Sequence, residues 1–178
     1  IGISYYEKRN FLEHEIHENE PFVFRLDTGL KVSEVRVNII PDMASGTYRV
    51  WLKGKYIPMF NAGLQRQSDQ FIPNLDLNKT CKIGEAFHSP FLNFSITFDP
   101  GYVYPHNATY FFIPASNADV ASYYRNKTSA TPKSDESNIV TIATTGEDPK
   151  KEKDFINTLM QTYIKSEQER HNEKGKKT

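Results

Sequence analysis

The chain has 178 residues, 38% of them apolar and 13% aromatic, which is enough for one sizeable domain or two small ones. Its 22 basic and 22 acidic residues balance, so the composition excludes a global field that would attract nucleic acid or an anionic membrane. Cys81 is the single cysteine; it excludes an internal disulfide and a cysteine-based structural zinc site, and it fits either a cytosol or a bacterial periplasm.

The N-terminal residues 1–6 alternate in the manner of a strand, and we predict the first strand there. No signal peptide is visible, and no apolar run approaches the ~20 residues that a membrane-spanning helix needs. Because the chain begins with Ile1 and not with Met, we interpret residue 1 as an internal position of a longer chain. The polar stretch 7–20 that follows is left open between a loop and a weak helix.

Two histidines in this stretch raise the question of a metal site. In a helix, His14 and His17 could face one metal ion, and His88 or His106 would have to supply a third ligand. Zinc-binding helices of this kind use a four-residue spacing, which the pair does not have. A solvated polar segment is therefore the favoured interpretation, and no metal ligand is predicted.

From residue 21 the apolar residues recur at every second position, which is typical of strands with one buried face. Turn signals separate these runs, among them Lys53-Gly54 and Asp99-Pro100-Gly101, and the interval 53–91 is predicted to be rich in loops. Short strands without intervening helices predict a β-sandwich or jelly-roll-like module. The predicted strands are 22–26, 35–39, 48–52, 92–98 and 110–112.

After Pro114 the pattern becomes helical. Ser116 can cap a helix over residues 116–125, with Asp119 three residues later in a capping box. Residues 139–142 are apolar on both sides of the pleat, so that strand is predicted to be covered on both faces. Asp148 as N-cap and Pro149 at the first position open a final helix.

The final helix, 148–171, carries one apolar stripe and becomes steadily more charged toward its end. The stripe is predicted to be part of the core. The charged continuation is left open between half of a coiled coil, a partner-binding helix and a solvated end. The stripe consists of Phe155, Leu159, Met160, Tyr163 and Ile164.

This order of elements predicts an α+β fold with a β module inserted into a small α/β base. The base comprises residues 1–20 and 106–178, with a sheet built from 1–6, 109–113 and 137–144 and covered by the two helices. The inserted β-sandwich-like module comprises residues 21–105. A long C-terminal helix completes the predicted fold.

The sequence contains no catalytic motif. Nothing matches a phosphate-binding loop, a dinucleotide fingerprint or a Gly-x-Ser-x-Gly nucleophile turn. A pair of glycosidase carboxylates is defined by a separation that a sequence does not give, so a glycoside hydrolase fragment stays open as an alternative.

Aromatic side chains give a second alternative, a free-standing carbohydrate-binding β module. Trp51, Tyr102 and Tyr104 could stack on sugar rings, as could Tyr48 and Tyr56, although most aromatics in a β module pack in the core. Tyr102 and Tyr104 are of particular interest because Pro100-Gly101 and Pro105 place them on a loop. Trp51, Tyr102 and Tyr104 are the residues that we predict to contact a glycan.

The residues also resemble a known family, the chain-length determinant domain of polysaccharide co-polymerases. The C-terminal third carries the strongest part of the resemblance, in Ser137-Asn138-Ile139-Val140-Thr141-Ile142, Asp148-Pro149, Phe155-Ile156-Asn157-Thr158-Leu159 and Tyr163. Upstream, the matching features are Ile3-Ser4-Tyr5-Tyr6, Pro21-Phe22, Gly84-Glu85 and Ser89-Pro90-Phe91. Together they resemble the larger version that is fused to a cytoplasmic tyrosine kinase in Bacteroidetes-type bacteria.

The resemblance implies a periplasmic, non-catalytic part of a bacterial inner-membrane protein. The whole protein would regulate the chain length and export of capsular or exopolysaccharide by forming homo-oligomers around the polymerisation and export machinery. Membrane-spanning helices would precede residue 1 and follow residue 178, and a long helical hairpin would lie before the second. ATP and Mg²⁺ would be bound only by the kinase domain, so no cofactor and no nucleic acid are expected on this chain.

Overall fold

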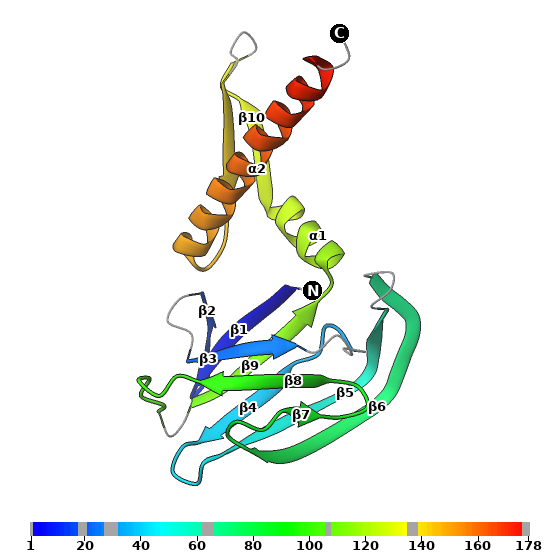
Figure 1. Cartoon of the computed structure of the whole chain (residues 1–178), viewed down its shortest axis with the longest axis vertical. Helices are drawn as coiled ribbons and strands as arrows, with labels where there is room; N and C mark the ends of the chain where they lie inside the picture. Colours follow the sequence, from blue (N-terminus) through cyan, green and yellow to red (C-terminus); the bar gives the residue numbers. More distant parts are fainter. Residues whose placement is uncertain are drawn as a thin grey trace. The chain divides into compact units, whose positions relative to one another are not determined.

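A computed structural model describes residues 2–17, 21–26, 32–61, 66–105, 108–134 and 139–175 (Figure 1). The chain divides into two compact units, Ile1–Ala121 and Ser122–Thr178. The α+β class predicted from the sequence is confirmed, with antiparallel sheets and a long C-terminal helix. The elements are β1 (Gly2–Arg9), β2 (Leu12–Ile16), β3 (Phe22–Leu26), β4 (Val37–Asp42), β5 (Thr47–Asn61), β6 (Arg66–Lys82), β7 (Phe87–His88), β8 (Asn93–Phe98), β9 (Ala108–Ala115), α1 (Asn117–Lys127), β10 (Thr128–Pro132), β11 (Val140–Thr144) and α2 (Pro149–Gly175).

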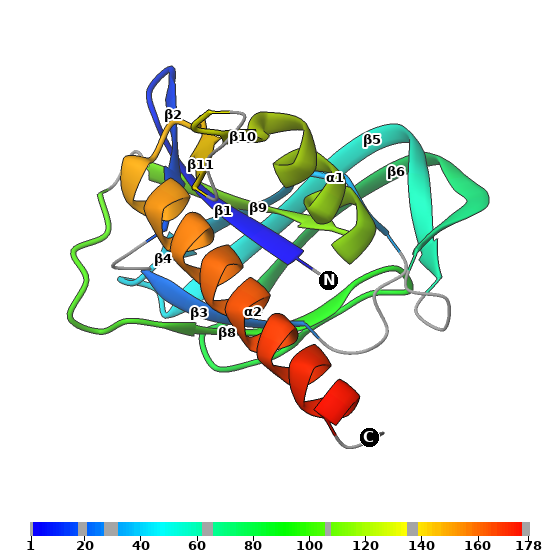
Figure 2. The same cartoon turned by 90° about the horizontal axis from the view of Figure 1, so that it is seen from above.

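The first unit contains two sheets that pack against each other. One has six strands in the order β2-β1-β9-β4-β5-β6, and the other has three in the order β3-β8-β7 (Figures 1 and 2). Phe24 on the small sheet lies 4.1 Å from Phe112 on the large one, ring centroid to ring centroid, and 4.6 Å from Phe94. The predicted alternation explains this core, because Tyr48, Val50 and Leu52 are all buried along β5.

Strand β9 occupies a central position in the large sheet. It pairs with β1, so that Gly2 lies opposite Ala115, and on its other side it pairs with β4. The predicted module 21–105 and the segments on either side of it thus contribute strands to one sheet. The division of the chain into an insert and a base stays a prediction.

The strand at 137–144 does not join the sheet that was predicted for it. Its described part, β11, pairs with β10 in a separate two-stranded sheet, with Thr128 opposite Thr144. The prediction that both of its faces are covered is also wrong, because Val140 is exposed. In a two-stranded antiparallel hairpin, a helix can cover one face while the side chains of the other face remain exposed to solvent. Ser137 and Asn138, which open this part of the resemblance, lie outside the described residues.

The described part of the polar stretch after the first strand, residues 7–17, is mostly strand and contains no helix. Strand β1 continues to Arg9, and a tight turn containing Asn10, with φ of 55°, leads into β2. Cross-strand charges stabilise the hairpin, with 3.5 Å between Lys8 Nζ and Glu13 Oε1. The polarity that suggested a loop comes from this pairing of charged side chains at the edge of the sheet.

The interval 53–91 is mostly strand, and the turn predicted at Lys53-Gly54 is wrong. Strands β5 and β6 form one long ribbon in which Lys53 pairs with Asp76 and Gly54 pairs with Leu75. A Cβ atom on Gly54 would lie 2.9 Å from Ile57 Cδ1, so glycine permits a close side-chain approach here and does not mark a turn.

The second unit is a hairpin, β10–β11, against which the first turns of α2 pack. Lys150 N donates to Asp148 Oδ1 at 2.9 Å and Glu152 N donates to Asp148 O at 3.1 Å, which confirms the predicted N-cap. The predicted N-cap of α1 is confirmed as well, since Asp119 N donates to Ser116 Oγ at 3.0 Å, and the Asp119 carboxylate accepts a hydrogen bond from the Ser116 hydroxyl. Among the described residues, no helix is long and apolar enough to cross a membrane.

The N-cap of α2 leads to a testable prediction. Asp148→Ala removes the side-chain oxygen that accepts from Lys150 N and Lys151 N, and it is expected to lower the free energy of unfolding by about 1 kcal/mol. Asp148→Asn keeps a capping oxygen and is expected to leave stability unchanged within about 0.5 kcal/mol. Urea denaturation followed by far-ultraviolet circular dichroism measures both, and equal losses for the two variants would contradict the capping role.

Candidate functional site

Trp51 lies on the outer face of the large sheet, where we predicted an accessible aromatic. Its side chain is 37% exposed, and its backbone oxygen accepts a hydrogen bond from Asn38 Nδ2 at 3.2 Å. On β6 its cross-strand neighbour is Asn78, and Lys53 and Asp76 form the next pair along the ribbon, with 2.9 Å between Nζ and Oδ2. This face combines an aromatic ring with amide and charged groups.

The same face is closed on the β9 side of Trp51. Phe111 is buried because Tyr6 stacks on it at 4.7 Å and the Arg36 guanidinium lies 3.9 Å from its ring centroid. Arg36 in turn donates two hydrogen bonds to Glu13, at 2.8 and 2.9 Å. These hydrogen bonds keep the pKa of Glu13 below its usual value. The open part of the face is therefore the β5–β6 ribbon.

Tyr102 and Tyr104 are not an open stacking platform. Their rings lie 4.9 Å apart, and Tyr104 also packs edge-on against Phe98 at 5.9 Å and Tyr110 at 6.1 Å. The Tyr104 hydroxyl donates one hydrogen bond that is shared between Pro21 O and, at 3.2 Å, Asp99 O. Burial raises the pKa of Tyr104 to about 12. These contacts tie the loop between β8 and β9 to the core. The structure brings the two tyrosines together and leaves Trp51 on another element.

A second exposed aromatic pair lies further along the ribbon, where sequence reasoning considered only one of its members. Tyr56 is 69% exposed and Phe71 is 52% exposed, and their ring centroids are 5.4 Å apart. Tyr56 has φ of 52°, a conformation that costs energy for a residue with a Cβ atom. Phe71 was missed because it falls in the interval that was predicted to be loops.

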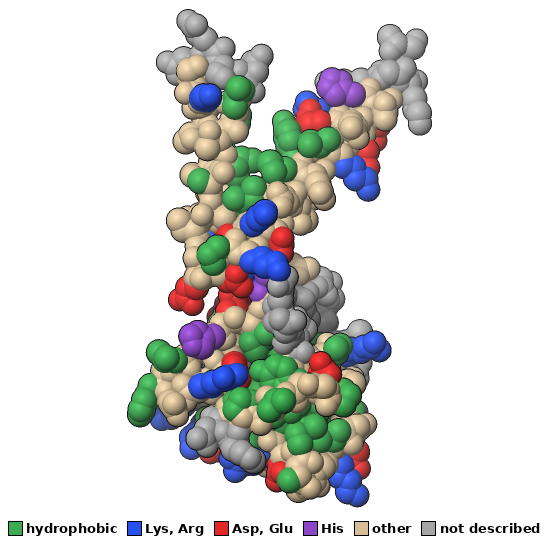
Figure 3. Space-filling view, turned by 90° about the vertical axis from the view of Figure 1, so that its left-hand side faces the viewer, with side chains coloured by type: hydrophobic (Ala, Val, Ile, Leu, Met, Phe, Trp, Pro, Cys, Tyr) green, Lys and Arg blue, Asp and Glu red, His purple; other side chains and the backbone are tan. Residues whose placement is uncertain are grey.

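The apolar stripe of α2 is exposed, which corrects the prediction that it belongs to the core. Phe155 is half-buried and stacks on Tyr124 at 4.0 Å, but Leu159, Met160, Tyr163 and Ile164 are all exposed. The first turns of the helix are joined to the hairpin by the hydrogen bond from Thr144 to Glu152, and further along the helix and the hairpin form two separate arms (Figure 3). Figure 3 shows hydrophobic side chains gathered in the fork between the hairpin and α2.

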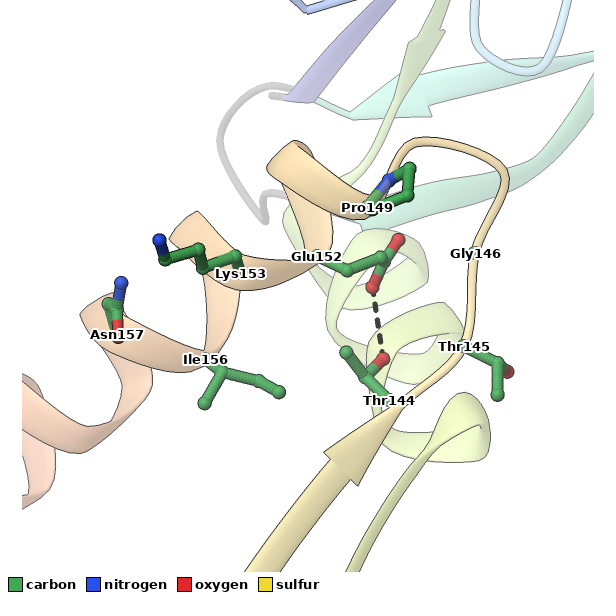
Figure 4. A pocket seen from close by; sticks show the side chains of 8 residues that line it. All are labelled: Thr144, Thr145, Gly146, Pro149, Glu152, Lys153, Ile156 and Asn157. Carbon is green, nitrogen blue, oxygen red and sulfur yellow. Dashed lines mark hydrogen bonds between the residues drawn. The ribbon is translucent and has the colours of Figure 1, made fainter.

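At the base of this fork, Glu152 connects three elements. Its buried carboxylate accepts hydrogen bonds from Lys127 Nζ and, at 3.0 Å, from Thr144 Oγ1 (Figure 4). Lys127 also lies 4.3 Å from the ring centroid of Tyr124. Burial acts to lower the pKa of Lys127, but the hydrogen bond to Glu152 and the electrostatic interactions with Tyr123, Glu152 and Tyr124 together outweigh it, so the pKa is raised. No local pattern in the sequence predicts this cluster, because its three members lie on three different elements and Lys127 is 25 residues from Glu152.

A pocket of about 490 Å³ lies beside this cluster. The Glu152 carboxylate at its wall already has both oxygens engaged, and no residue of the lining pairs a nucleophile with a general base. The arrangement is that of a structural link between strand and helix. The lining residues, drawn in Figure 4, are Thr144, Thr145, Gly146, Pro149, Glu152, Lys153, Ile156 and Asn157.

The histidine pair does not have the helical geometry that a metal site would require. His14 lies on β2 and His88 on β7, His17 follows β2, and His106 lies outside the described residues. Within the described ranges, no group of three or more His, Cys, Asp or Glu side chains could hold a metal ion.

Comparison with known proteins gives no relative for this chain: no family model, no curated protein and no solved structure matches it.

Proposed function

We propose that this chain is a non-catalytic assembly domain in the periplasmic part of a bacterial inner-membrane tyrosine kinase and polysaccharide co-polymerase. By forming homo-oligomers it would regulate the chain length and export of capsular or exopolysaccharide, together with the polymerisation and export machinery. The motif resemblance in the C-terminal third supports this proposal. The observation that carries it is the exposed apolar stripe of α2.

The stripe has the properties of a contact surface between copies of the chain. Leu159, Met160, Tyr163 and Ile164 lie on one side of the helix at three- and four-residue spacing, and all are exposed. Isolated exposed apolar residues are common, but a contiguous row of large ones marks an interaction site. A second copy of α2 presents the same row, so two helices can bury their stripes against each other.

Self-association of the purified chain tests this proposal. We expect concentration-dependent association in analytical ultracentrifugation, and we expect Leu159→Glu with Tyr163→Glu to weaken it by about tenfold or more, because charges would enter a desolvated contact. A matched control, Gln161→Glu with Gln168→Glu, adds the same charges on the opposite side of α2 and should leave association unchanged. Association of the stripe variant as strong as that of the unmodified chain would contradict the proposal.

A cellular readout extends the same comparison. In a bacterium that carries the substitutions in its chromosomal gene, the stripe variant is expected to alter the length distribution of the surface polysaccharide, while the control pair leaves it as it was. All four positions are exposed, so the variants should fold with stabilities within about 0.5 kcal/mol of the original.

The second candidate is the free-standing carbohydrate-binding β module. The exposed Trp51 beside the Asn78 amide favours it, because ring faces and amides are the groups that contact sugars. The packing of Tyr102 and Tyr104 means that a glycan site built on those two tyrosines would need the loop to leave the core.

A further inference from the structure

The outer face of the β5–β6 ribbon presents a ladder of exposed side chains. Residues that lie opposite each other across two antiparallel strands project to the same face. Trp51 lies opposite Asn78, and the pairs on either side of it continue the ladder with hydroxyl, amide, carboxylate and basic groups. These flanking pairs are Arg49 with Thr80, Lys53 with Asp76, and Lys55 with Asn74.

Basic residues outnumber acidic residues in this ladder. Lys53 is paired with Asp76, whereas neither Arg49 nor Lys55 forms an ion pair within the described residues. The two basic groups lie on either side of Trp51 along the same strand. An anionic group that approaches the indole ring would therefore find an available cation on each side.

The aromatic groups continue along the ribbon. Tyr56 lies five positions after Trp51, a distance of about 17 Å at the usual rise of a strand. The strained backbone of Tyr56 holds its ring in solvent against Phe71. An open strip of this length suits an extended polymer better than a small molecule, which would favour an enclosed cavity.

We infer that this strip, from Arg49 to the Tyr56–Phe71 pair, binds an extended acidic polysaccharide. The C–H faces of the sugar rings would stack on Trp51 and on the Tyr56–Phe71 pair, the amides would meet hydroxyl groups, and Arg49 and Lys55 would pair with carboxylates of the polymer.

A polysaccharide fits this strip better than a protein or a nucleic acid. The centre of a protein interface is depleted in charged residues, whereas here charged groups surround the central aromatic. Nucleic-acid affinity depends on neutralising many phosphates, and this strip has only two available cations on a chain whose charges balance. The inference goes beyond the assembly role and does not depend on it.

Trp51 makes the binding experiment direct, because it is the only tryptophan of the chain. Its fluorescence is titrated with oligogalacturonide, alginate and hyaluronan fragments, and with oligogalacturonide whose carboxyl groups are methyl-esterified. We expect saturable changes with at least one acidic polymer and weaker binding at high salt. If the acidic polymer is the oligogalacturonide, esterification should weaken binding by about fivefold or more.

Calorimetry with variants locates the site. Trp51→Ala is expected to weaken binding by about tenfold or more, and Arg49→Gln with Lys55→Gln by about fivefold. Arg125→Gln with Lys165→Gln removes two exposed cations from other elements and serves as the matched control. Tyr56→Ala is expected to weaken binding of long fragments and to spare the shortest ones.

Three results would overturn the inference. The first is no binding of any acidic polymer. The second is equal binding of the acidic and esterified forms when oligogalacturonide is the polymer that binds. The third is equal losses of affinity in the Arg49/Lys55 variant and its control. Circular dichroism of each variant shows whether the fold is intact, and the Arg49/Lys55 variant, which changes only exposed side chains, keeps the test decisive if Trp51→Ala unfolds. Each of these results can occur whether or not the chain self-associates through α2, so the two proposals are tested separately.

Discussion

Replacement of Glu152 by alanine is expected to destabilise the second unit by about 3–5 kcal/mol. The Lys127 side chain is only 12% exposed, and the Glu152 carboxylate offsets the free-energy cost of burying its charge. The substitution removes that carboxylate and leaves the ammonium group unpaired. It also removes the acceptor of Thr144, so β11 and α2 lose their polar link. Hydrogen exchange of amides in β11 and α2, together with urea denaturation, measures the loss in the complete chain.

Three companion variants separate charge from packing in this cluster. Glu152→Gln keeps an acceptor for Thr144 but not the charge. Its free energy of unfolding should lie between those of the original chain and the alanine variant. Glu152→Met with Lys127→Met removes both charges and should recover most of the stability, since a buried ion pair contributes little beyond its apolar replacement. Glu169→Ala, on an exposed part of α2, is the control. A loss below about 0.5 kcal/mol for Glu152→Ala would contradict the buried-pair account.

Phe94→Ala is expected to cost about 3–5 kcal/mol in the first unit. Phe94 is buried on β8 and packs against three other phenyl rings. The distances between ring centroids are 4.6 Å to Phe24, 4.8 Å to Phe87 and 5.6 Å to Phe112. Because Phe112 belongs to the six-stranded sheet, the alanine leaves a cavity at the interface between the two sheets. Thermal unfolding followed by near-ultraviolet circular dichroism measures the effect.

Phe11 offers a matched control for this cavity. Its side chain is 98% exposed at the turn between β1 and β2. The same change, Phe11→Ala, therefore removes a phenyl ring without leaving a cavity in the core. We expect its effect on stability to stay within about 0.5 kcal/mol. A comparable loss for both variants would mean that Phe94 does not join the two sheets as described.

The elements that the sequence predicted are those whose signals are local. The caps Ser116 and Asp148 act on N–H groups two or three residues away, and the alternation in β5 reflects one buried face. Strand β2, the end of β1 and most of β6 were missed because these segments are rich in polar residues. The outer half of β5 was missed because Lys53-Gly54 was interpreted as a turn. The pairing of β11 with β10 was missed because periodicity shows that a strand exists but not which strand it joins.

The candidate site could be predicted only where its residues depend on a local sequence pattern. Trp51 alternates with buried residues, so its exposure follows from the pattern of its strand. The packing of Tyr104 depends on hydrogen bonds to Pro21 and Asp99, and the former lies far away along the chain. The Tyr56–Phe71 pair depends on the register of two strands and on one strained residue, neither of which leaves a local signal.

The pairing of the first strand with β9 has a consequence for the order in which the first unit is made. Since Gly2 lies opposite Ala115, the six-stranded sheet cannot close until nearly all of this unit has left the ribosome or crossed a membrane. The β1–β2 hairpin can form early, but the other edge of β1 then keeps unpaired backbone N–H and C=O groups until β9 has been made. Long-range pairing of this kind slows folding and prolongs exposure to aggregation. The chain should therefore depend on chaperones during its synthesis or export more than a helical domain of similar size.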